Sequence, residues 1–284
     1  MPSNQDPALP LSACVGGFQV ADLLVSGTRA VWLRARKDGK LYVLKVPTHG
    51  YARDDTWRRR MAREADLLQL LAGGPFPTLI AAGVYDTTDA ADIPYVVTDL
   101  PDGLPLPDVR ARQASPDVAL AVRVLSGLLE ALSFAHARGV VHRNLKPDKI
   151  TLLRAGTLRI EDLQLGLGAA TPALTRQGSF VGSLDYSAPE QLSDAHSVDG
   201  RADLYAAGLI AYELMTHTHP YAGASNERDA MFRRKLDHPE SASRRNPAVG
   251  EPLASVVSKL VAHDRDARPA TADAALAALR FAAG

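Results

Sequence analysis

Lys45 and Glu64 are charged residues at positions where the surrounding sequence pattern predicts burial. Lys45 shares one face of the strand-like run 41–46 with apolar neighbours, because side chains alternate along a strand. On a helical wheel of residues 54–72, Glu64 falls in the middle of the apolar side chains. A buried cation and a buried carboxylate are each costly unless they pair, so this pattern favours an ion pair. The alternative is that the two charges reach the surface separately.

The elements that must position these residues fall into two groups. Short apolar runs predict a meander of strands in the first third of the chain, and the predicted strands are 18–25, 30–35, 41–46 and 95–98. Residues 54–72 predict a helix. The Pro- and Gly-rich run 100–107 is the predicted boundary between two lobes.

Beyond this boundary the chain turns helical. Ser115 is predicted to cap a long helix that has Pro116 at its first position and reaches His136. Residues 149–160 predict a hairpin, and the almost entirely apolar run 204–215 predicts a core helix. The predicted organisation is a flexible leader at 1–13, an N-terminal lobe at 14–100 and a C-terminal lobe at 101–284.

Composition excludes several classes of partner and location. The 32 basic residues balance the 32 acidic residues, so bulk charge recruits neither nucleic acid nor an anionic membrane. The single cysteine, Cys14, rules out an internal disulfide, and we see no apolar run near 18 residues and no signal-peptide pattern. We therefore expect a soluble, cytoplasmic chain.

Together with five further motifs, the separation of 19 residues between Lys45 and Glu64 resembles the protein-kinase signature set in order and spacing. The motifs are HRNLKP at 142–147, EDLQ at 161–164, GSLDYSAPE at 182–190, DLYAAG at 203–208 and ARP at 267–269. The likeness is nearest to bacterial relatives of the eukaryotic Ser/Thr kinases. It implies an α+β, two-lobed protein-kinase-like fold with an N-terminal antiparallel sheet plus one helix and a mainly helical C-terminal lobe.

The resemblance implies roles for several residues that are retained. Lys45 would hold the α- and β-phosphates of ATP, Glu64 would orient it, and Lys146 is present in the catalytic loop. The position of the catalytic base, however, is Asn144. An amide cannot accept a proton from a substrate hydroxyl at neutral pH, and losing a general base typically costs about 10²–10⁴ in rate.

The metal site that the resemblance implies is also altered. Lys149 stands where the family has an asparagine ligand, and a protonated lysine has no lone pair for Mg²⁺. Asp162 would be the remaining ligand, but Gln164 replaces the glycine that follows it in the family and should hinder a backbone flip there. Lys149 either extends into solvent or places its ammonium where Mg²⁺ would lie and pairs with Asp162.

The phosphate-covering loop of the family, G-x-G-x-x-G, here reads VSGTRA at 25–30 and keeps only Gly27. The side chains of Val25 and Ala30 hinder the approach of backbone N–H groups to phosphate. The same register places Trp32 at the adenine site.

At the hinge, Thr98 corresponds to the gatekeeper residue and is followed by Asp99. Pro101 stands where a backbone N–H would bind the adenine ring, and proline has no N–H.

The residues that hold the C-terminal lobe together match the family, in contrast to the nucleotide site. Glu190 and Arg268 correspond to its structural ion pair, Asp203 to the residue that holds the catalytic loop, and His142 and Arg143 to that loop itself. The segment that the family regulates by phosphorylation contains Thr171, Thr175 and Ser179. It is either an ordinary polar loop or a phosphorylated docking site for a phosphopeptide reader.

The nucleotide-site residues are altered while the structural residues of the C-terminal lobe are kept. This pattern predicts a pseudokinase, that is, a protein-binding, scaffolding or regulatory domain without efficient phosphoryl transfer. No cofactor or metal is expected, and ATP, with or without Mg²⁺, would bind weakly. The alternatives are a weakly active Ser/Thr kinase that uses Lys45, Glu64, Lys146 and Asp162, and an ATP sensor without turnover. The expected partners are proteins, an active kinase or a phosphopeptide-binding domain among them, with no nucleic acid and no membrane.

Overall fold

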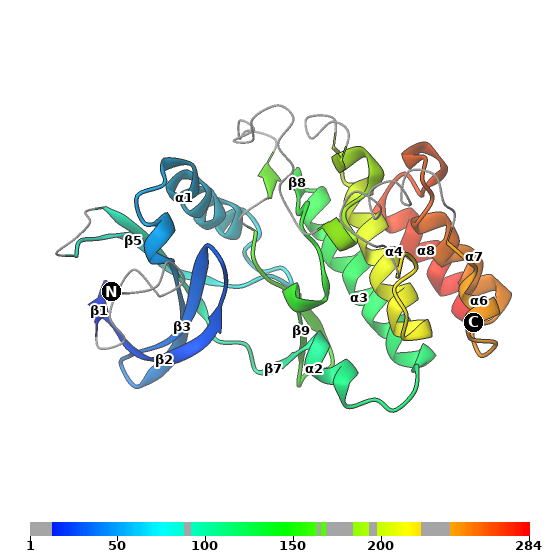
Figure 1. Cartoon of the computed structure of the whole chain (residues 1–284), viewed down its shortest axis with the longest axis horizontal. Coiled ribbons are helices and arrows are strands. Elements are labelled where there is room, and N and C mark those ends of the chain that lie inside the picture. Colours follow the sequence, from blue (N-terminus) through cyan, green and yellow to red (C-terminus); the bar gives the residue numbers. More distant parts are fainter. Residues whose placement is uncertain (1–12, 88–91, 164–165, 169–183, 193–197, 223–238) are drawn as a thin grey trace. The chain divides into compact units, whose positions relative to one another are not determined.

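The structure of the protein is a computed structural model. It describes residues 13–87, 92–163, 166–168, 184–192, 198–222 and 239–284. The chain divides into two compact units, Met1–Asp102 and Gly103–Gly284, which we call the N-lobe and the C-lobe (Figure 1). The division falls within the Pro- and Gly-rich run 100–107.

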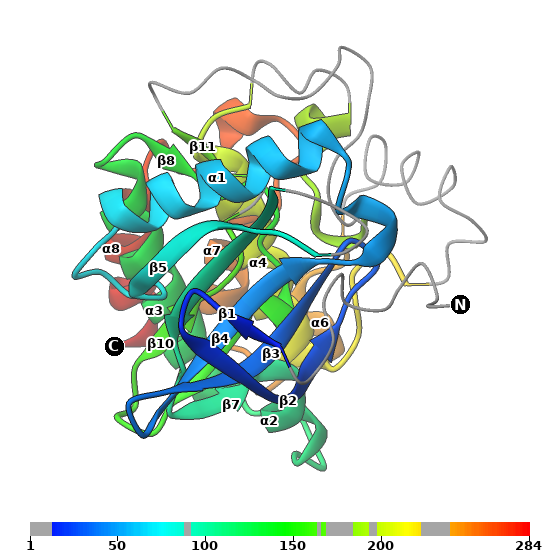
Figure 2. The ribbon, with the colours of Figure 1, turned by 90° about the vertical axis from the view of Figure 1, so that its left-hand side faces the viewer.

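The N-lobe is built on a six-stranded antiparallel sheet with the order β1-β2-β3-β4-β6-β5 (Figure 2). Its strands are β1 Cys14–Val15, β2 Phe18–Ser26, β3 Ala30–Lys37, β4 Lys40–Pro47, β5 Leu79–Tyr85 and β6 Ile93–Asp99. The four predicted strands lie in β2, β3, β4 and β6, whereas β5 was not predicted. Its sequence, LIAAGVY, is apolar throughout and lacks the alternation that indicates a strand.

A tight hairpin fixes the register of β3 against β4. Asp38 and Gly39 both have positive φ, 49° and 75°, which a two-residue turn with right-handed strand twist requires. Lys37 and Lys40 are therefore opposite each other, and this register places Trp32 opposite Lys45. The sheet thus sets the positions of two of the residues that the sequence analysis assigned to the nucleotide site, Trp32 and Lys45.

The helix of the N-lobe is α1, Asp55–Leu70, preceded by a 3₁₀ turn, η1 His49–Tyr51. The Asp54 carboxylate accepts a hydrogen bond from the Trp57 amide at 2.8 Å and so caps the helix. α1 contacts β5 and β6. Met61 and Leu68 are buried on this side, together with Glu64.

The C-lobe is mainly helical. In the part of this lobe that the structure describes, the helices are α2 Leu106–Ala111, α3 Val118–His136, α4 Arg201–Thr216, α6 Ala242–Arg245, α7 Glu251–Leu260 and α8 Ala272–Ala283. Two small sheets have the orders β10-β9-β7 and β11-β8. Their strands are β7 Gly103–Pro105, β8 Val140–Val141, β9 Ile150–Leu153, β10 Leu158–Ile160 and β11 Leu167–Gly168. The 3₁₀ turns are η2 Pro147–Lys149, η3 Leu184–Tyr186, η4 Pro189–Leu192 and η5 Arg265–Ala267.

The predicted start of α3 was wrong. The helix begins at Val118 and is capped by Asp117, whose carboxylate accepts a hydrogen bond from the Leu120 amide at 2.9 Å. Ser115 and Pro116 lie before the helix. An aspartate at this position satisfies a free amide and also interacts favourably with the helix dipole, so it defines the start more strongly than the Ser-Pro pair upstream.

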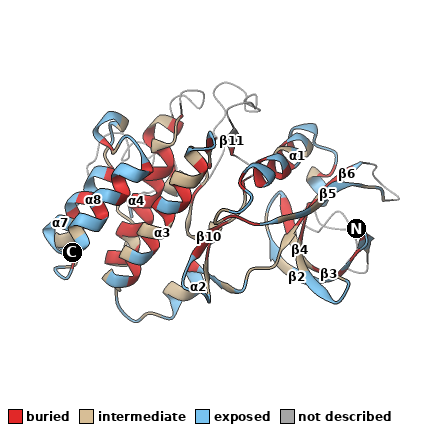
Figure 3. Cartoon of the chain, turned by 180° about the vertical axis from the view of Figure 1, so that it is seen from behind, coloured by how far each residue is buried: buried red, intermediate tan, exposed pale blue. Residues whose placement is uncertain are grey.

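The core of the C-lobe forms around α3 and α4, which contact each other, while α3 also contacts α8. In Figure 3, long parts of both helices are buried. Among the described residues, α3 alone is long and apolar enough to pass as a membrane span, but half of its apolar window is buried inside the protein. Its apolar side chains are thus accounted for by packing in the lobe.

Candidate functional site

The predicted ion pair between Lys45 and Glu64 is present in the N-lobe. The Lys45 ammonium on β4 lies 2.7 Å and 2.9 Å from the two carboxylate oxygens of Glu64 on α1. The side chains are only 4% and 5% exposed, so the alternative of two separate surface charges is wrong. In this low-dielectric position each charge depends on the other for compensation.

Trp32 lies against the same ammonium. The Lys45 nitrogen is 4.8 Å from the centre of the Trp32 ring, a cation–π distance. This contact follows from the strand register, because Trp32 and Lys45 are direct partners on β3 and β4. The ammonium is therefore held by a carboxylate and also by an aromatic face.

The loop at 25–30 forms hydrogen bonds within itself and to the end of β4. The Gly27 amide donates to the Ala30 carbonyl at 3.0 Å. The Thr48 amide donates to the carbonyl of Arg29 at 3.0 Å, and its hydroxyl donates to that of Thr28 at 3.2 Å. A phosphate-binding loop needs free N–H groups, and the amide of the one retained glycine is already bonded.

Space also explains why Gly27 is retained. A Cβ atom at this position would lie 2.9 Å from the Ala30 carbonyl oxygen and 3.1 Å from the Trp32 ring. Ala30 is buried, whereas Val25 is exposed. The glycine thus serves the packing of this loop on Trp32.

The hinge residues of the sequence prediction lie at the end of β6. Thr98 is paired with Val43 and Leu79 in the sheet. The Asp99 carboxylate accepts a hydrogen bond from the Thr78 amide at 2.6 Å, so it is engaged within the N-lobe. Pro101 follows between β6 and β7 and offers no N–H.

In the C-lobe, Asp203 near the start of α4 holds the loop that follows β8. Its carboxylate accepts hydrogen bonds from the amides of His142 at 2.9 Å and Arg143 at 2.8 Å, and lies 2.9 Å from His136 Nε2. Burial alone would raise the pKa of Asp203, but the His136 hydrogen bond and the neighbouring imidazoles and Arg143 amide hold this pKa below its usual value. The carboxylate thus remains an anion that positions the loop.

Two residues of this region have left-handed backbone conformations, Arg143 with φ 65° and Asp162 with φ 63°. Such conformations cost roughly 1–3 kcal/mol for residues other than glycine and persist only where neighbours fix them. His142 joins the two segments: its Nδ1 accepts the Asn144 amide at 3.2 Å, so its Nε2 carries the proton and donates to the Glu161 carbonyl at 3.0 Å. Asn144 therefore occupies a well-fixed backbone position.

Four charged side chains close to Asn144 in sequence or in the same site form a connected series, which we call the loop network: Lys146, Asp148, Lys149 and Asp162. The Lys149 ammonium lies 2.8 Å from Asp162 and 3.7 Å from Asp148, and that of Lys146 lies 2.9 Å from Asp148. The Lys149 side chain is only 13% exposed, so the alternative that it extends into solvent is wrong. Two cations and two anions compensate one another.

Both carboxylates of the loop network contact ammonium groups. Within the described parts of the chain, no three His, Cys, Asp or Glu side chains are grouped as metal ligands. Asp162, the ligand that the resemblance implies, contacts an ammonium. A divalent cation at this position would have to displace Lys149 first.

The structural ion pair of the C-lobe is formed by Arg268 and Glu190. The guanidinium binds both carboxylate oxygens, at 2.7 Å and 2.9 Å, and its side chain is 0% exposed. Its remaining N–H groups donate to the carbonyls of Ala262, His263 and Arg201. This side chain therefore joins η4 and the start of α4 to the segment that follows α7.

Sequence reasoning missed two residues that support the loop. Asp148 bridges Lys146 and Lys149. Gln191 donates from its side-chain amide to the Arg143 carbonyl at 2.9 Å and accepts from the Ala188 amide at 3.0 Å. Both are direct sequence neighbours of predicted site residues, which is the one signal that pointed to them. Gln164, Thr171, Thr175 and Ser179 lie outside the described residues.

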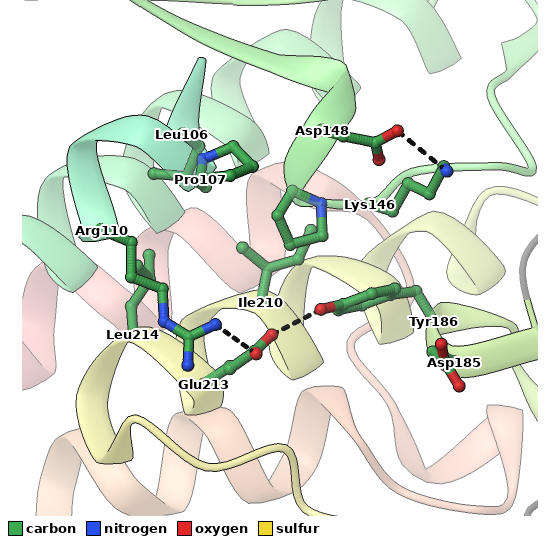
Figure 4. Close-up of a pocket in the computed structure, with 11 residues that line it drawn as sticks. Leu106, Pro107, Arg110, Lys146, Asp148, Asp185, Tyr186, Ile210, Glu213 and Leu214 are labelled. Carbon is green, nitrogen blue, oxygen red and sulfur yellow. Dashed lines mark hydrogen bonds and ion pairs between the residues drawn. The ribbon is translucent and has the colours of Figure 1, made fainter. Parts of the chain in front are cut away.

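A pocket of about 350 Å³ in the C-lobe lies next to Lys146 and Asp148 (Figure 4). Glu213 on α4 accepts hydrogen bonds there from Arg110 on α2 and from the Tyr186 hydroxyl. Burial, followed by the bond to Glu213, raises the pKa of Tyr186, so the phenol remains a donor. The acid in this pocket is thus already compensated by side chains of the C-lobe.

The fold, the Lys45–Glu64 pair, the loop held by Asp203 and the Arg268–Glu190 pair define a protein-kinase-like domain. The sequence matches the family described as "Protein kinase domain" over residues 18–278. The chain therefore belongs to the protein kinase family.

Several bacterial proteins are similar to the chain. A probable serine/threonine-protein kinase of Streptomyces coelicolor is 31% identical, with 91% of this chain and 38% of that protein covered. The serine/threonine-protein kinase PknB of Mycobacterium tuberculosis is 30% identical over 84% of this chain and 38% of PknB. PrkC of Bacillus subtilis, also a serine/threonine-protein kinase, is 27% identical over 81% of this chain and 34% of PrkC. The chain thus spans less than two fifths of the length of these relatives.

Proposed function

We propose that this domain is a pseudokinase that acts by binding protein partners, as a scaffold or regulator, without efficient phosphoryl transfer. The observation that carries the proposal is the contact of 2.8 Å between the Lys149 ammonium and Asp162. It pairs the one retained metal-binding carboxylate with a cation of the chain itself. The proposal includes that the nucleotide site is degenerate, that is, that it has lost residues needed for phosphoryl transfer.

The chemistry of phosphoryl transfer supports this proposal. The reaction depends on metal ions that neutralise developing charge and on a base that accepts the substrate proton. Asn144 cannot act as that base, and the loss of a general base alone lowers the rate by a factor of about 10²–10⁴. Bringing Mg²⁺ to Asp162 would also break an ion pair that is only 13% and 8% exposed.

A second function is a weakly active Ser/Thr protein kinase. The similarity to bacterial serine/threonine-protein kinases and the intact Lys45–Glu64 pair favour it. It would use Lys45, Glu64, Lys146 and Asp162, with one metal ion or none. An ATP-binding sensor without turnover would rest on the same ion pair.

The partners of the pseudokinase would be proteins. An active kinase could phosphorylate Thr171, Thr175 or Ser179, and a phosphopeptide-binding domain could then dock on the modified segment. We further propose that the domain acts in the cytoplasm. The single cysteine, which leaves no internal disulfide, and the balanced charge support this location and argue against nucleic-acid or membrane partners.

A phosphoryl-transfer assay tests the proposed function. The purified chain is incubated with γ-labelled ATP and Mg²⁺ or Mn²⁺, with itself and a generic protein as acceptors, beside an Asp162→Asn variant. We expect the label incorporated by the wild-type chain to equal that of the variant. Incorporation that Asp162→Asn abolishes would establish the weakly active kinase in place of the pseudokinase.

A further inference from the structure

The indole of Trp32 lies between the loop 26–29 and the ammonium of Lys45. Its ring centre is 4.8 Å from the Lys45 nitrogen. A Cβ atom placed on Gly27 would be 3.1 Å from the ring, so loop and ring are in contact. The half-buried ring therefore fills the space between two groups that bind phosphates in this family.

The tip of the same loop is anchored on its other side. The Arg29 guanidinium lies 5.8 Å from the ring centre of Tyr51 and 5.9 Å from that of Trp57. The two rings are themselves 5.9 Å apart. Together with the two hydrogen bonds from Thr48, these contacts fix the loop against the start of α1.

Two groups of the N-lobe to which the resemblance assigns phosphate binding have partners within the lobe. The Gly27 amide is bonded to Ala30, and the Lys45 ammonium is bonded to Glu64. Trp32 covers the ammonium. For a phosphate to bind here, the Trp32 ring must move away from Lys45 and the loop 26–29 must open. Both movements break contacts that stabilise the folded N-lobe.

We propose that Trp32 is a specificity-determining residue that excludes nucleoside triphosphates from the N-lobe, with Arg29 holding the loop against it. The inference rests on the proposed function and deepens it, since it assigns the loss of ATP binding to one side chain. The other altered positions, Val25, Ala30 and Pro101, then contribute less. Restoring a small side chain at position 32 should expose an ammonium that Glu64 already orients.

Titration calorimetry with ATP, in the presence and absence of Mg²⁺, tests this inference on four chains: wild type, Trp32→Val, Trp32→Phe and Arg29→Ala. We expect Trp32→Val to bind ATP at least about tenfold more tightly than wild type. In this variant the phosphates reach the Lys45 ammonium without first breaking its cation–π contact with the Trp32 ring. Trp32→Phe keeps an aromatic face on Lys45 and should match wild type. Arg29→Ala, a change at an exposed residue that leaves the core intact, should tighten binding by a smaller factor.

Intrinsic fluorescence gives a second readout, because the chain has two tryptophans, Trp32 and Trp57. In a Trp57→Phe chain the emission reports Trp32 alone, and the inference predicts less quenching by acrylamide than in the same chain carrying Arg29→Ala. Equal quenching would contradict the anchoring role of Arg29.

ATP affinities of Trp32→Val and Arg29→Ala that equal that of wild type would overturn the role of Trp32 and leave the pseudokinase proposal standing. Phosphoryl transfer by the wild-type chain would instead overturn the proposed function. A Trp32→Val chain that binds ATP without transferring phosphate satisfies both, because Asn144 and Lys149 are unchanged in it.

Discussion

Replacing Arg268 with alanine is expected to lower the free energy of unfolding by about 3–5 kcal/mol, the usual cost of removing one partner of a buried ion pair. Its side chain is 0% exposed and binds both oxygens of Glu190. The substitution leaves that carboxylate without its main compensation and three backbone carbonyls without their donor. Urea unfolding followed by circular dichroism measures the change.

Arg280→Ala is the matched control for this experiment. Arg280 also pairs with a glutamate, Glu130, but the two side chains are 66% and 54% exposed. Its removal should change the free energy of unfolding by less than about 1 kcal/mol. Equal effects of the two substitutions would contradict the structural role assigned to Arg268.

Replacing Lys45 with methionine is expected to destabilise the N-lobe by a similar amount, about 3–5 kcal/mol, because Glu64 would remain buried without its cation. The double variant Lys45→Met/Glu64→Leu should recover most of this loss, since apolar replacement of a whole buried pair is often neutral. Thermal and urea unfolding of the single and double variants measure the coupling between the two residues.

Lys40→Met controls for the loss of a lysine from the same strand, because Lys40 is exposed at the β3–β4 hairpin. We expect it to leave stability unchanged within about 0.5 kcal/mol. If Lys45→Met were as stable as Lys40→Met, the pair would not stabilise the fold, and its retention would favour a nucleotide-binding role.

The Lys45–Glu64 pair could be predicted from sequence because periodicity alone turns both residues inward. The same holds for the core position of α4, whose sequence is apolar almost all round. Asn144 and Lys149 could be identified as altered because the surrounding motifs fix their spacing. For Lys149, sequence left two alternatives, and the distance to Asp162 decided between them.

Other features depend on contacts that no local pattern encodes. Arg110 and Glu213 are 103 residues apart in sequence, and neither belongs to a motif that would join them. The loop at 25–30 reads as an eroded glycine loop, yet its Gly27 amide donates to the Ala30 carbonyl, and its Thr28 and Arg29 carbonyls accept hydrogen bonds from Thr48 after β4. The position of Trp32 at the adenine site stays a prediction, and its contact with the Lys45 ammonium follows from the strand register. Such contacts follow from tertiary packing rather than from propensity.

The central claim is that two groups retained for binding MgATP are covered by other side chains of the protein: the Lys45 ammonium by the Trp32 ring, and the Asp162 carboxylate by Lys149. Titration calorimetry of the wild-type chain with ATP up to millimolar concentration, with and without Mg²⁺, tests it most directly. We predict no saturable heat at either condition and no rise in the unfolding temperature. Saturable binding that depends on Mg²⁺, and that Asp162→Asn weakens, would contradict the claim.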